Sequence, residues 1–221
     1  MITFLTDRSR ALYIVLKLIL MIKTIIFDLG AVLIDWNPHY LYRKIFSEEA
    51  EMLHFLENIC TPDWNEEQDE GRPLAEATEM LVTRHPEHAG NIRAFYGRWE
   101  EMLGGAIEGT VEIFRELKES GKYNLYALTN WSAETFPVAQ ERYDFLGWFD
   151  GIVVSGTEKD RKPFATFYHT LLNRYDVHPP EALFIDDNLR NIKAAEQLGI
   201  TSIHFASPEA LREVLKEKGV L

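Results

Sequence analysis

The second half of the sequence alternates between segments typical of strands and segments typical of helices. From Thr110 to the C-terminus, short apolar runs are each followed by a longer run in which apolar residues recur at helical spacing. The predicted strands are 124–128, 151–154, 182–185 and 202–205, and the predicted helices are 111–120, 132–143, 164–175, 188–198 and a last one beginning at Ser207-Pro208. Strands that alternate with helices form a parallel sheet with helices on both faces. The sequence therefore predicts an α/β protein with a Rossmann-like, three-layer α/β/α core.

The stretch 24–35 adds a strand that runs directly into a carboxylate. The apolar run 24–27 is followed by Asp28, and Gly30 comes two residues later. Other predicted strands also close on polar residues, namely Thr129, Ser155 and the pair Asp186-Asp187. Any one of these residues can be an ordinary turn residue. Because ligands bind beyond the carboxyl ends of parallel strands, we expect these polar residues to line a single crevice.

Helical patterns fill the segment 36–104. The predicted helices there are 47–59, 73–83 and 92–103, and no part of the segment is predicted to be a strand. Glycines at 104, 105 and 109 mark a hinge-like boundary. We therefore expect a helical cap at 36–104, inserted into a core made of 21–35 and 105–221. An acidic run in this cap is expected to be solvated surface, and it consists of Glu66, Glu67, Asp69 and Glu70.

Residues 1–20 are expected to be an N-terminal extension outside the core. Two arginines precede an apolar run, 11–22, which resembles the basic start and apolar middle of a signal peptide. No small-residue cleavage site follows, and the run is shorter than the roughly 20 residues of a membrane helix. Met21 would be a natural start for a cytosolic protein, so the extension is also interpretable as a mis-called start.

The charge and the cysteine count narrow the classes of function. The 221 residues carry a formal net charge of -12, which disfavours electrostatic binding to nucleic acid or to an anionic membrane. A phosphorylated substrate would need a cation to offset repulsion locally. Cys60 is the single cysteine, so no intrachain disulfide can form, which suits a reducing cytoplasm. We expect a cytoplasmic protein with no nucleic-acid or membrane partner, and the oligomeric state stays open.

Four short motifs occur in order along the chain. They are Phe-Asp-Leu-Gly at 27–30, Leu-Thr-Asn at 128–130, Arg-Lys-Pro at 161–163 and Asp-Asp-Asn at 186–188. Together, over residues 22–221, they resemble the motifs of the haloacid dehalogenase superfamily. The first and last motifs are similar to those of a branch that contains sugar-phosphate phosphatases, including enzymes acting on glucose 1-phosphate. The resemblance implies a Mg²⁺-dependent phosphatase for a small phosphorylated metabolite, such as a sugar phosphate.

The resemblance also implies a role for each acidic residue of the motifs. Asp28 would be the nucleophile that forms an aspartyl-phosphate intermediate. Mg²⁺ would be held by Asp28, by the backbone carbonyl of Gly30 and by an acid of the last motif. The usual spacing of the family makes Asp187 the better of the two candidate ligands, because Asp186 stands where many relatives have glycine.

The two middle motifs would bind the phosphate. Thr129 would donate its hydroxyl to a phosphate oxygen, and Lys162 would pair with both Asp28 and the phosphate. Asn130 either contacts the substrate or holds down the loop that follows its strand. Taken one at a time, Thr129 and Lys162 could be a strand-end residue and a loop lysine.

Gly30 departs from the pattern of most phosphatases in this superfamily. They carry a second aspartate there, which protonates the leaving group, and losing a general acid typically lowers the rate by roughly 10²–10⁴. Three explanations are open. The substrate can have a good leaving group, such as the anomeric oxygen of a sugar 1-phosphate. Another group, such as Asp35 or His39, can take over the role. Finally, the protein can be a weak enzyme.

Two other functions were considered. A hydrolytic 2-haloacid dehalogenase of this superfamily needs no metal, and the adjacent acids Asp186 and Asp187 beside Asp28 would then repel one another without compensation. They therefore favour Mg²⁺ and a phosphate ester. A non-catalytic module that binds phosphate or a protein partner is the third possibility, motivated by Gly30 and by the apolar extension.

Overall fold

The computed structural model describes residues 21–221, and the N-terminal extension predicted at 1–20 lies outside this range. Five strands form one parallel sheet in the order β5-β4-β1-β6-β7. The strands are β1 (Thr24–Phe27), β4 (Asn124–Thr129), β5 (Gly151–Val154), β6 (Ala182–Asp186) and β7 (Thr201–His204). All five were predicted from the sequence, and their parallel pairing confirms the predicted α/β class.

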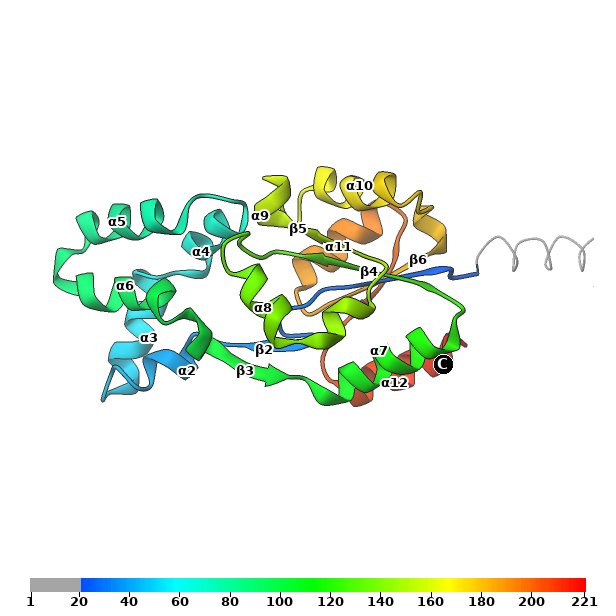
Figure 1. The fold of residues 1–221 in the computed structure, drawn as a ribbon, viewed down its shortest axis with the longest axis horizontal. Coiled ribbons are helices and arrows are strands. Elements are labelled where there is room, and N and C mark those ends of the chain that lie inside the picture. Colours follow the sequence, from blue (N-terminus) through cyan, green and yellow to red (C-terminus); the bar gives the residue numbers. More distant parts are fainter. Residues whose placement is uncertain (1–20) are drawn as a thin grey trace, which may run out of the picture.

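Helices cover both faces of this sheet (Figure 1). One face carries α7 (Glu108–Ser120) and α12 (Pro208–Glu217), and the other carries α10 (Ala165–Arg174) and α11 (Leu189–Gln197). The side chains of β1 divide between the two layers, because successive residues of a strand point to opposite faces. Ile25 and Phe27 belong to the apolar cluster that includes residues of α7 and α12, and Ile26 belongs to the cluster that includes residues of α10 and α11. The predicted three-layer α/β/α core is therefore confirmed.

The remaining helices form a group at one end of the sheet, at the left of Figure 1. We call them the cap helices, and they are α2 (His39–Tyr42), α3 (Glu49–Asn58), α4 (Pro62–Asp69), α5 (Leu74–Arg84) and α6 (Ala89–Gly97). A two-stranded antiparallel ribbon leads into and out of them, made of β2 (Ile34–Trp36) and β3 (Leu103–Ala106). Two short helices complete the fold, α8 (Phe136–Arg142) and α9 (Ser155–Glu158).

The ribbon corrects the sequence prediction at the end of the cap. The helix expected at 92–103 ends earlier, at Gly97, and a 3-10 turn at Trp99–Met102 leads into β3. Gly104 and Gly105 lie in this strand, whereas the sequence predicted a hinge. Glycine has a low strand propensity, so the pattern gave no strand signal. The pairing explains the residue type, because a Cβ on Gly104 would collide with the carboxylate of Asp35 across the ribbon.

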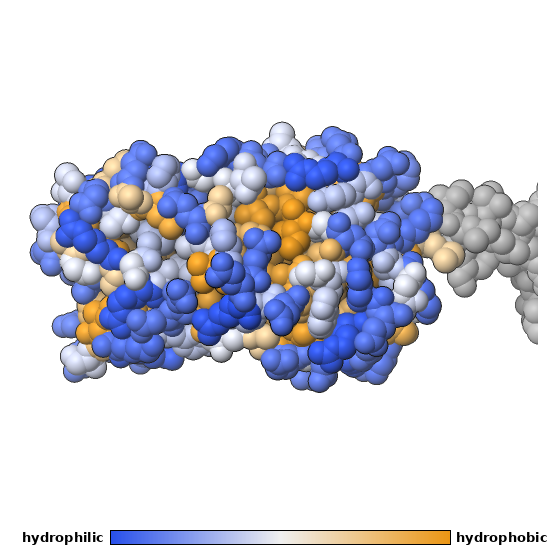
Figure 2. Space-filling view, viewed as in Figure 1, coloured by the Kyte–Doolittle hydropathy of each residue, from blue (hydrophilic) through white to orange (hydrophobic). Residues whose placement is uncertain are grey.

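The visible surface is mostly polar. Figure 2 shows hydrophilic side chains over most of one face, with a hydrophobic area in the middle of the view, over β5. In residues 21–221, none of the helices combines the length and the apolar character that a membrane crossing needs.

Candidate active site

The candidate site begins where three neighbouring strands end. β1 lies between β4 and β6, and Phe27 is in register with Ala127 on one side and Ile185 on the other. The next residues along the three strands belong to the predicted motifs, with Asp28 directly after β1. Its backbone N–H donates to the carbonyl of Ile185 over 2.8 Å, which extends the sheet by one bond. Parallel pairing therefore brings three motifs that are far apart in the sequence to one edge.

Lys162 supplies the positive charge at this edge and is completely buried. Its Nζ lies 2.9 Å from Oδ1 of Asp28 and donates to Oδ2 of Asp186 over 2.7 Å. Asn130 fixes the backbone on which the lysine stands. Its amide nitrogen donates to the carbonyl of Lys162 over 3.0 Å, and its amide oxygen accepts from the N–H of Lys162 over 2.9 Å. These bonds hold the loop that carries Lys162, and because Asn130 also lines the two cavities at this site, its contact with substrate stays a prediction.

Three carboxylates surround this single lysine. One oxygen from each of Asp28, Asp186 and Asp187 can be chosen so that all three lie within 4.8 Å of one another. Burial raises the pKa of Asp28 to about 8; Lys162 opposes this shift, and the other two carboxylates add to it. Burial and the neighbouring Asp186 also raise the pKa of Asp187. One buried cation does not balance three acids, and such a cluster suits a divalent cation.

The two adjacent acids differ in how they are bound. Asp186 is completely buried, and besides Lys162 it accepts from the N–H of Asn188 over 2.8 Å and from the amide of Asn191. The Asp187 side chain is more exposed than that of Asp186 and lines a cavity above the strand ends, called the main cavity below. The oxygens of Asp186 are thus occupied by hydrogen-bond donors, whereas the carboxylate of Asp187 faces open space.

Thr129 ends β4 and is completely buried. Within the described chain its Oγ1 has no hydrogen-bond partner. A buried hydroxyl without a partner carries a free-energy cost of about 1–3 kcal/mol, so such groups call for an explanation. A ligand oxygen at the strand ends would give it an acceptor.

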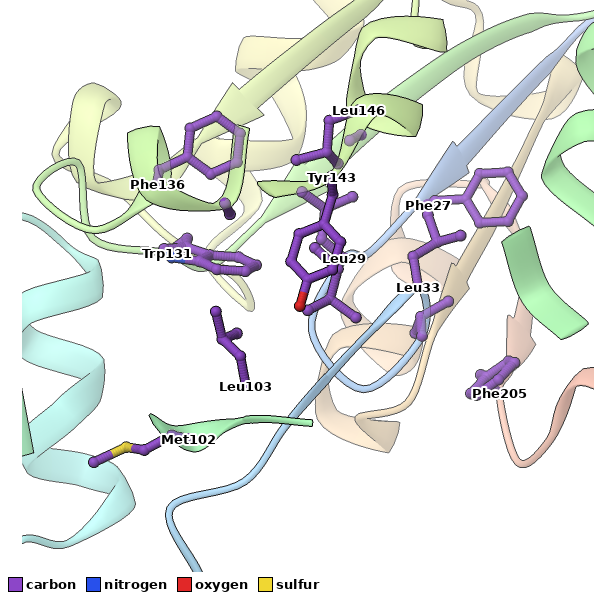
Figure 3. Close-up of a cluster of buried hydrophobic side chains, with 14 of the residues drawn as sticks. Phe27, Leu29, Leu33, Met102, Leu103, Trp131, Phe136, Tyr143, Leu146 and Phe205 are labelled. Carbon is purple, nitrogen blue, oxygen red and sulfur yellow. The ribbon is translucent and has the colours of Figure 1, made fainter. Parts of the chain in front are cut away.

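The loop after Asp28 is anchored by apolar side chains. Leu29 and Leu33 are completely buried in a cluster that also holds Phe27 and Tyr143 (Figure 3). Gly30 lies between the two leucines in sequence, and a Cβ added to it would point into open space. Its two sequence neighbours aside, no atom of residues 21–221 lies within 4 Å of a Cβ placed on Gly30. The glycine is therefore not required by packing.

A cavity of about 440 Å³ opens above the strand ends and reaches into the cap helices. Its core wall includes Asp28, Lys162 and Asp187, and its cap wall combines apolar and acidic side chains. The apolar cap residues include Leu53, Leu56, Cys60 and Phe95, and the acidic ones are Glu57, Glu66 and Asp69. A second cavity of about 110 Å³ adjoins Gly30 and is also lined by Asp69.

The two residues considered as substitutes for the missing acid lie in different places. His39 lines the main cavity. The carboxylate of Asp35 accepts a hydrogen bond from the hydroxyl of Tyr40 over 2.6 Å and faces a separate hollow on the surface. Among the described lining residues of the two cavities at Gly30 and Asp28, Asp35 does not occur.

The acidic run of α4 is solvated surface only in part: Glu67 is exposed as expected, whereas Glu66 and Glu70 pair with arginines. Glu66 lies 2.8 Å from the guanidinium of Arg161 and also pairs with Arg190, and Glu70 lies 3.1 Å from Arg161. Both arginines belong to the core, so these pairs join the cap to it. Glu66 is also largely buried. The run reads as solvated in sequence because its partners are about a hundred residues away.

Asp69 is the functional candidate that the sequence analysis missed. Burial raises the pKa of this carboxyl to about 7. Its Oδ2 accepts from the amide of Asn65 over 2.9 Å, and the hydroxyl of Tyr96 donates to the oxygen of the same amide over 2.9 Å. Helix α4, which carries Asp69, was not among the predicted helices. The pair Thr61-Pro62 is a sequence signal for its start, because the Thr61 hydroxyl caps α4 by accepting from the N–H of Trp64.

Comparison with known proteins adds the following. Residues 22–199 match the family of haloacid dehalogenase-like hydrolases. The sesquiterpene phosphatase astK of Aspergillus oryzae is 29% identical over 183 residues, which cover 83% of this chain and 89% of that protein. A phosphorylated carbohydrates phosphatase of Thermotoga maritima is 25% identical over 189 residues, covering 82% and 84%. Among solved structures, a haloacid dehalogenase family enzyme of Bacteroides thetaiotaomicron, in a magnesium complex, superposes with a TM-score of 0.68 at 22% identity, covering 88% and 98%.

Proposed function

This chain belongs to the haloacid dehalogenase-like hydrolases, and we propose that it is a Mg²⁺-dependent phosphatase that hydrolyses a small phosphomonoester through an aspartyl phosphate on Asp28. One observation carries the proposal. Lys162 is buried between Asp28 and Asp186 at the ends of neighbouring strands, with Asp187 beside them in an open cavity. A phosphoryl group needs this combination of a fixed nucleophile and concentrated positive charge.

The residues present fit a magnesium ion. Asp28, Asp187 and the backbone carbonyl of Gly30 would hold it, because the oxygens of Asp186 are occupied by Lys162 and by amide donors. Bound there, Mg²⁺ would supply positive charge that offsets the excess of carboxylates and the charge of the phosphate. Asp186 would then act by fixing the ammonium group of Lys162.

The proposed reaction has two steps. A carboxylate oxygen of Asp28 attacks phosphorus, and the bond between phosphorus and the leaving oxygen breaks. Water then attacks the phosphorus of the aspartyl phosphate, and inorganic phosphate leaves while Asp28 is regenerated. Lys162 favours the ionised form of Asp28 and would hold a phosphate oxygen with its one remaining N–H. Thr129 would donate its unpartnered hydroxyl to another.

Two classes of alcohol are candidates for the leaving group. A sugar phosphate is favoured by the similarity of the first and last motifs to those of sugar-phosphate phosphatases. An apolar alcohol is favoured by the cap wall of the cavity, where Leu53, Leu56 and Phe95 lie opposite the carboxylates. The sesquiterpene phosphatase among the relatives agrees with the second class.

The test is phosphate release from a panel of monoesters. It includes glucose 1-phosphate, farnesyl phosphate and p-nitrophenyl phosphate, each with Mg²⁺ and with EDTA. We expect Mg²⁺-dependent release that falls by at least about 10³-fold in Asp28→Asn, since removal of a nucleophile commonly costs that much or more. The matched control is Asp63→Asn on the exposed side of α4, which should keep wild-type rates.

Three outcomes would reject the proposal. Turnover that survives both EDTA and Asp28→Asn would show that this site is not responsible. Release of chloride from 2-chloropropionate without a metal, and no release of phosphate, would identify a dehalogenase. Absence of turnover, together with BeF₃⁻ binding lost in Asp28→Asn, would identify a phosphate-binding protein.

A further inference from the structure

Asp69 combines three properties that the proposed phosphatase chemistry has not yet used. It stands at the end of α4, it lines the main cavity together with Asp28 and Lys162, and it lines the smaller cavity together with Gly30. Among the described residues around the smaller cavity it is the one carboxylate. An acid from the cap therefore lines the same small cavity as the position where the first motif lacks one.

We propose that Asp69 is the general acid that protonates the leaving oxygen, in place of the acid missing at Gly30. The inference rests on the proposed phosphatase function and adds a catalytic residue from a different element. It identifies the substrates as esters of alcohols that need a proton to leave, such as alkyl alcohols. A chain without any acid would be restricted to good leaving groups.

Hydrogen bonds hold the Asp69 side chain in place. Oδ2 accepts from Asn65, one turn earlier on α4, and Asn65 is itself held by the hydroxyl of Tyr96 on α6. The backbone carbonyl of Asp69 accepts from the hydroxyl of Ser155, which follows β5. The residue is thus fixed both to the cap and to the core.

Contacts between α4 and the core keep the acid over the strand ends. Arg161 precedes the catalytic lysine in the sequence and pairs with Glu66 and Glu70 of the cap. Lys159, in the same loop, donates to the carbonyl of Gly71 over 2.9 Å. The loop that carries the lysine is therefore joined to the cap helix that carries the acid.

The surroundings of Asp69 favour a protonated carboxyl near neutral pH. Burial is the largest cause of the raised pKa, and the carboxylate of Glu66 adds to it, whereas the N–H of Ser132 and the guanidinium of Arg161 lower it. Tyr96 lies beside it on α6. Across the main cavity it faces Asp28, Lys162, Asp187, Glu57 and His39. An acid that titrates near the working pH is best suited to give and take a proton.

The proton balance is closed by this one residue. As the bond from Asp28 to phosphorus forms and the ester bond breaks, the carboxyl of Asp69 gives its proton to the leaving alkoxide. The alcohol departs neutral, and Asp69 is left as a carboxylate. It then takes a proton from the water that attacks the aspartyl phosphate, which restores the starting state.

The test compares leaving groups that differ in their need for a proton. Wild type, Asp69→Asn and the matched control Asp63→Asn are assayed with an alkyl phosphate and with 2,4-dinitrophenyl phosphate. We expect Asp69→Asn to lose about 10²-fold or more in kcat on the alkyl ester and less than about fivefold on the aryl ester. The control should lose neither. The kcat of wild type on the alkyl ester should fall as the pH rises above about 7, and this decline should be absent in Asp69→Asn.

A rescue variant tests the position of the acid. Gly30 has room for a side chain, so Gly30→Asp restores the usual acid. In the double variant Gly30→Asp/Asp69→Asn, activity on the alkyl ester should recover at least about tenfold over Asp69→Asn. If Asp69→Asn does not accumulate as folded protein, Asn65→Ala replaces it, because loss of the amide that orients Asp69 should also affect the alkyl ester more.

The outcomes separate this inference from the proposed function. Equal losses on both esters, or no loss on either, would overturn the role of Asp69 while Asp28→Asn remained inactive, and the phosphatase proposal would stand. Activity that survives Asp28→Asn would instead remove the phosphatase proposal itself. Failure of the rescue, in a folded double variant, would also count against the assignment of the acid.

Discussion

The two walls of the main cavity are built in different ways. The core wall consists mainly of residues at the ends of β1, β4 and β6, whose positions are fixed by backbone hydrogen bonds between neighbouring strands, and Lys162 joins them from the loop between α9 and α10. The cap wall consists of residues on helices that are held by aromatic packing. Ring centroids lie 5.0 Å apart for Tyr42 and Phe55, and 5.2 Å apart for Trp64 and Phe95. The backbone therefore positions the strand ends of the core wall, and side-chain packing positions the cap wall.

The walls also differ in charge and polarity. The core wall concentrates one buried lysine and several carboxylates within a few ångströms. The cap wall is apolar around Leu56 and Phe95 and acidic at Glu57 and Asp69. A phosphoryl group fits the first wall and a neutral alcohol fits the second, since a second anionic group would meet like charges there. We infer that the core wall determines the reaction and the cap wall determines the alcohol.

The largest effect is expected on the core wall, from Lys162→Met. The change leaves Asp28 and Asp186 buried without their shared cation, and breaking a buried pair in this way typically costs about 3–5 kcal/mol of unfolding free energy. Phosphatase activity should fall by at least about 10³-fold because the proposed nucleophile, Asp28, and the phosphate would lose the same cation. Urea unfolding without metal and phosphate release with Mg²⁺ measure the two effects.

An exposed lysine provides the matched control. Lys216 pairs with Glu213 over 2.9 Å, and both side chains are more than half exposed. Lys216→Met should change the unfolding free energy by less than about 1 kcal/mol. If the two variants were equally stable, the ion pairs of Lys162 would have no structural role, and the contrast drawn between the walls would fail.

The same contrast explains which features the sequence could predict. The strands β1, β4, β5, β6 and β7 were predictable because each is a short apolar run. The position of the motifs was predictable because polar residues follow several of these runs. A parallel sheet places such ends at one edge whatever the details of packing. The neighbourhood of Asp28, Thr129 and Asp186 was therefore expected before any contact was known. The place of Lys162 was expected only from the resemblance of its motif, and the chemical roles of all four residues remain proposals.

Features that depend on distant partners were not predictable. β3 contains Gly104 and Gly105 and forms a strand because β2 is there to pair with it. Asp69 was interpreted as part of a solvated acidic run, and its burial depends on packing of α4 against the start of α9 and the segment after β4. Local sequence indicates secondary-structure propensity and the spacing of apolar residues. The positions of these residues depend on tertiary contacts, which neither property predicts.

A smaller effect is expected on the cap wall, from Leu53→Asn. Leu53 lines the main cavity on α3, so the change places a polar group against the alcohol. For an apolar ester such as farnesyl phosphate, we expect KM to rise about tenfold with little change in kcat, which corresponds to about 1.4 kcal/mol of lost binding. For p-nitrophenyl phosphate, which is shorter, the change in KM should be less than about threefold.

The control for this variant is Met80→Asn. Met80 is a large apolar residue of the cap that is 40% exposed, and it is on α5, outside the described lining of the main cavity. Its substitution should leave KM unchanged for both esters. A tenfold fall in kcat for Leu53→Asn, with KM unchanged, would show that the cap wall affects the chemical step. It would contradict the inference that this wall determines only which alcohol is bound.

The smallest expected effect concerns the charge of the cap wall and is read from stability. The pKa of Asp69 is raised from 3.8 to about 7 in the folded protein, so ionisation of Asp69 disfavours folding. The stability contributed by its protonated form is complete below about pH 4 and is lost as the pH rises through about 7. Asp69→Asn cannot ionise, and it should therefore be more stable than wild type at about pH 8 and similar to it near pH 4. A difference of about 1 kcal/mol corresponds to a rise in Tm of roughly 2–4 °C for a chain of this size.

Asp63→Asn, on the exposed side of the same helix, should show no such dependence on pH. A Tm difference between Asp69→Asn and wild type that is the same at both pH values would mean that Asp69 does not titrate in this range, and the cap wall would then carry a permanent charge and could not supply a proton.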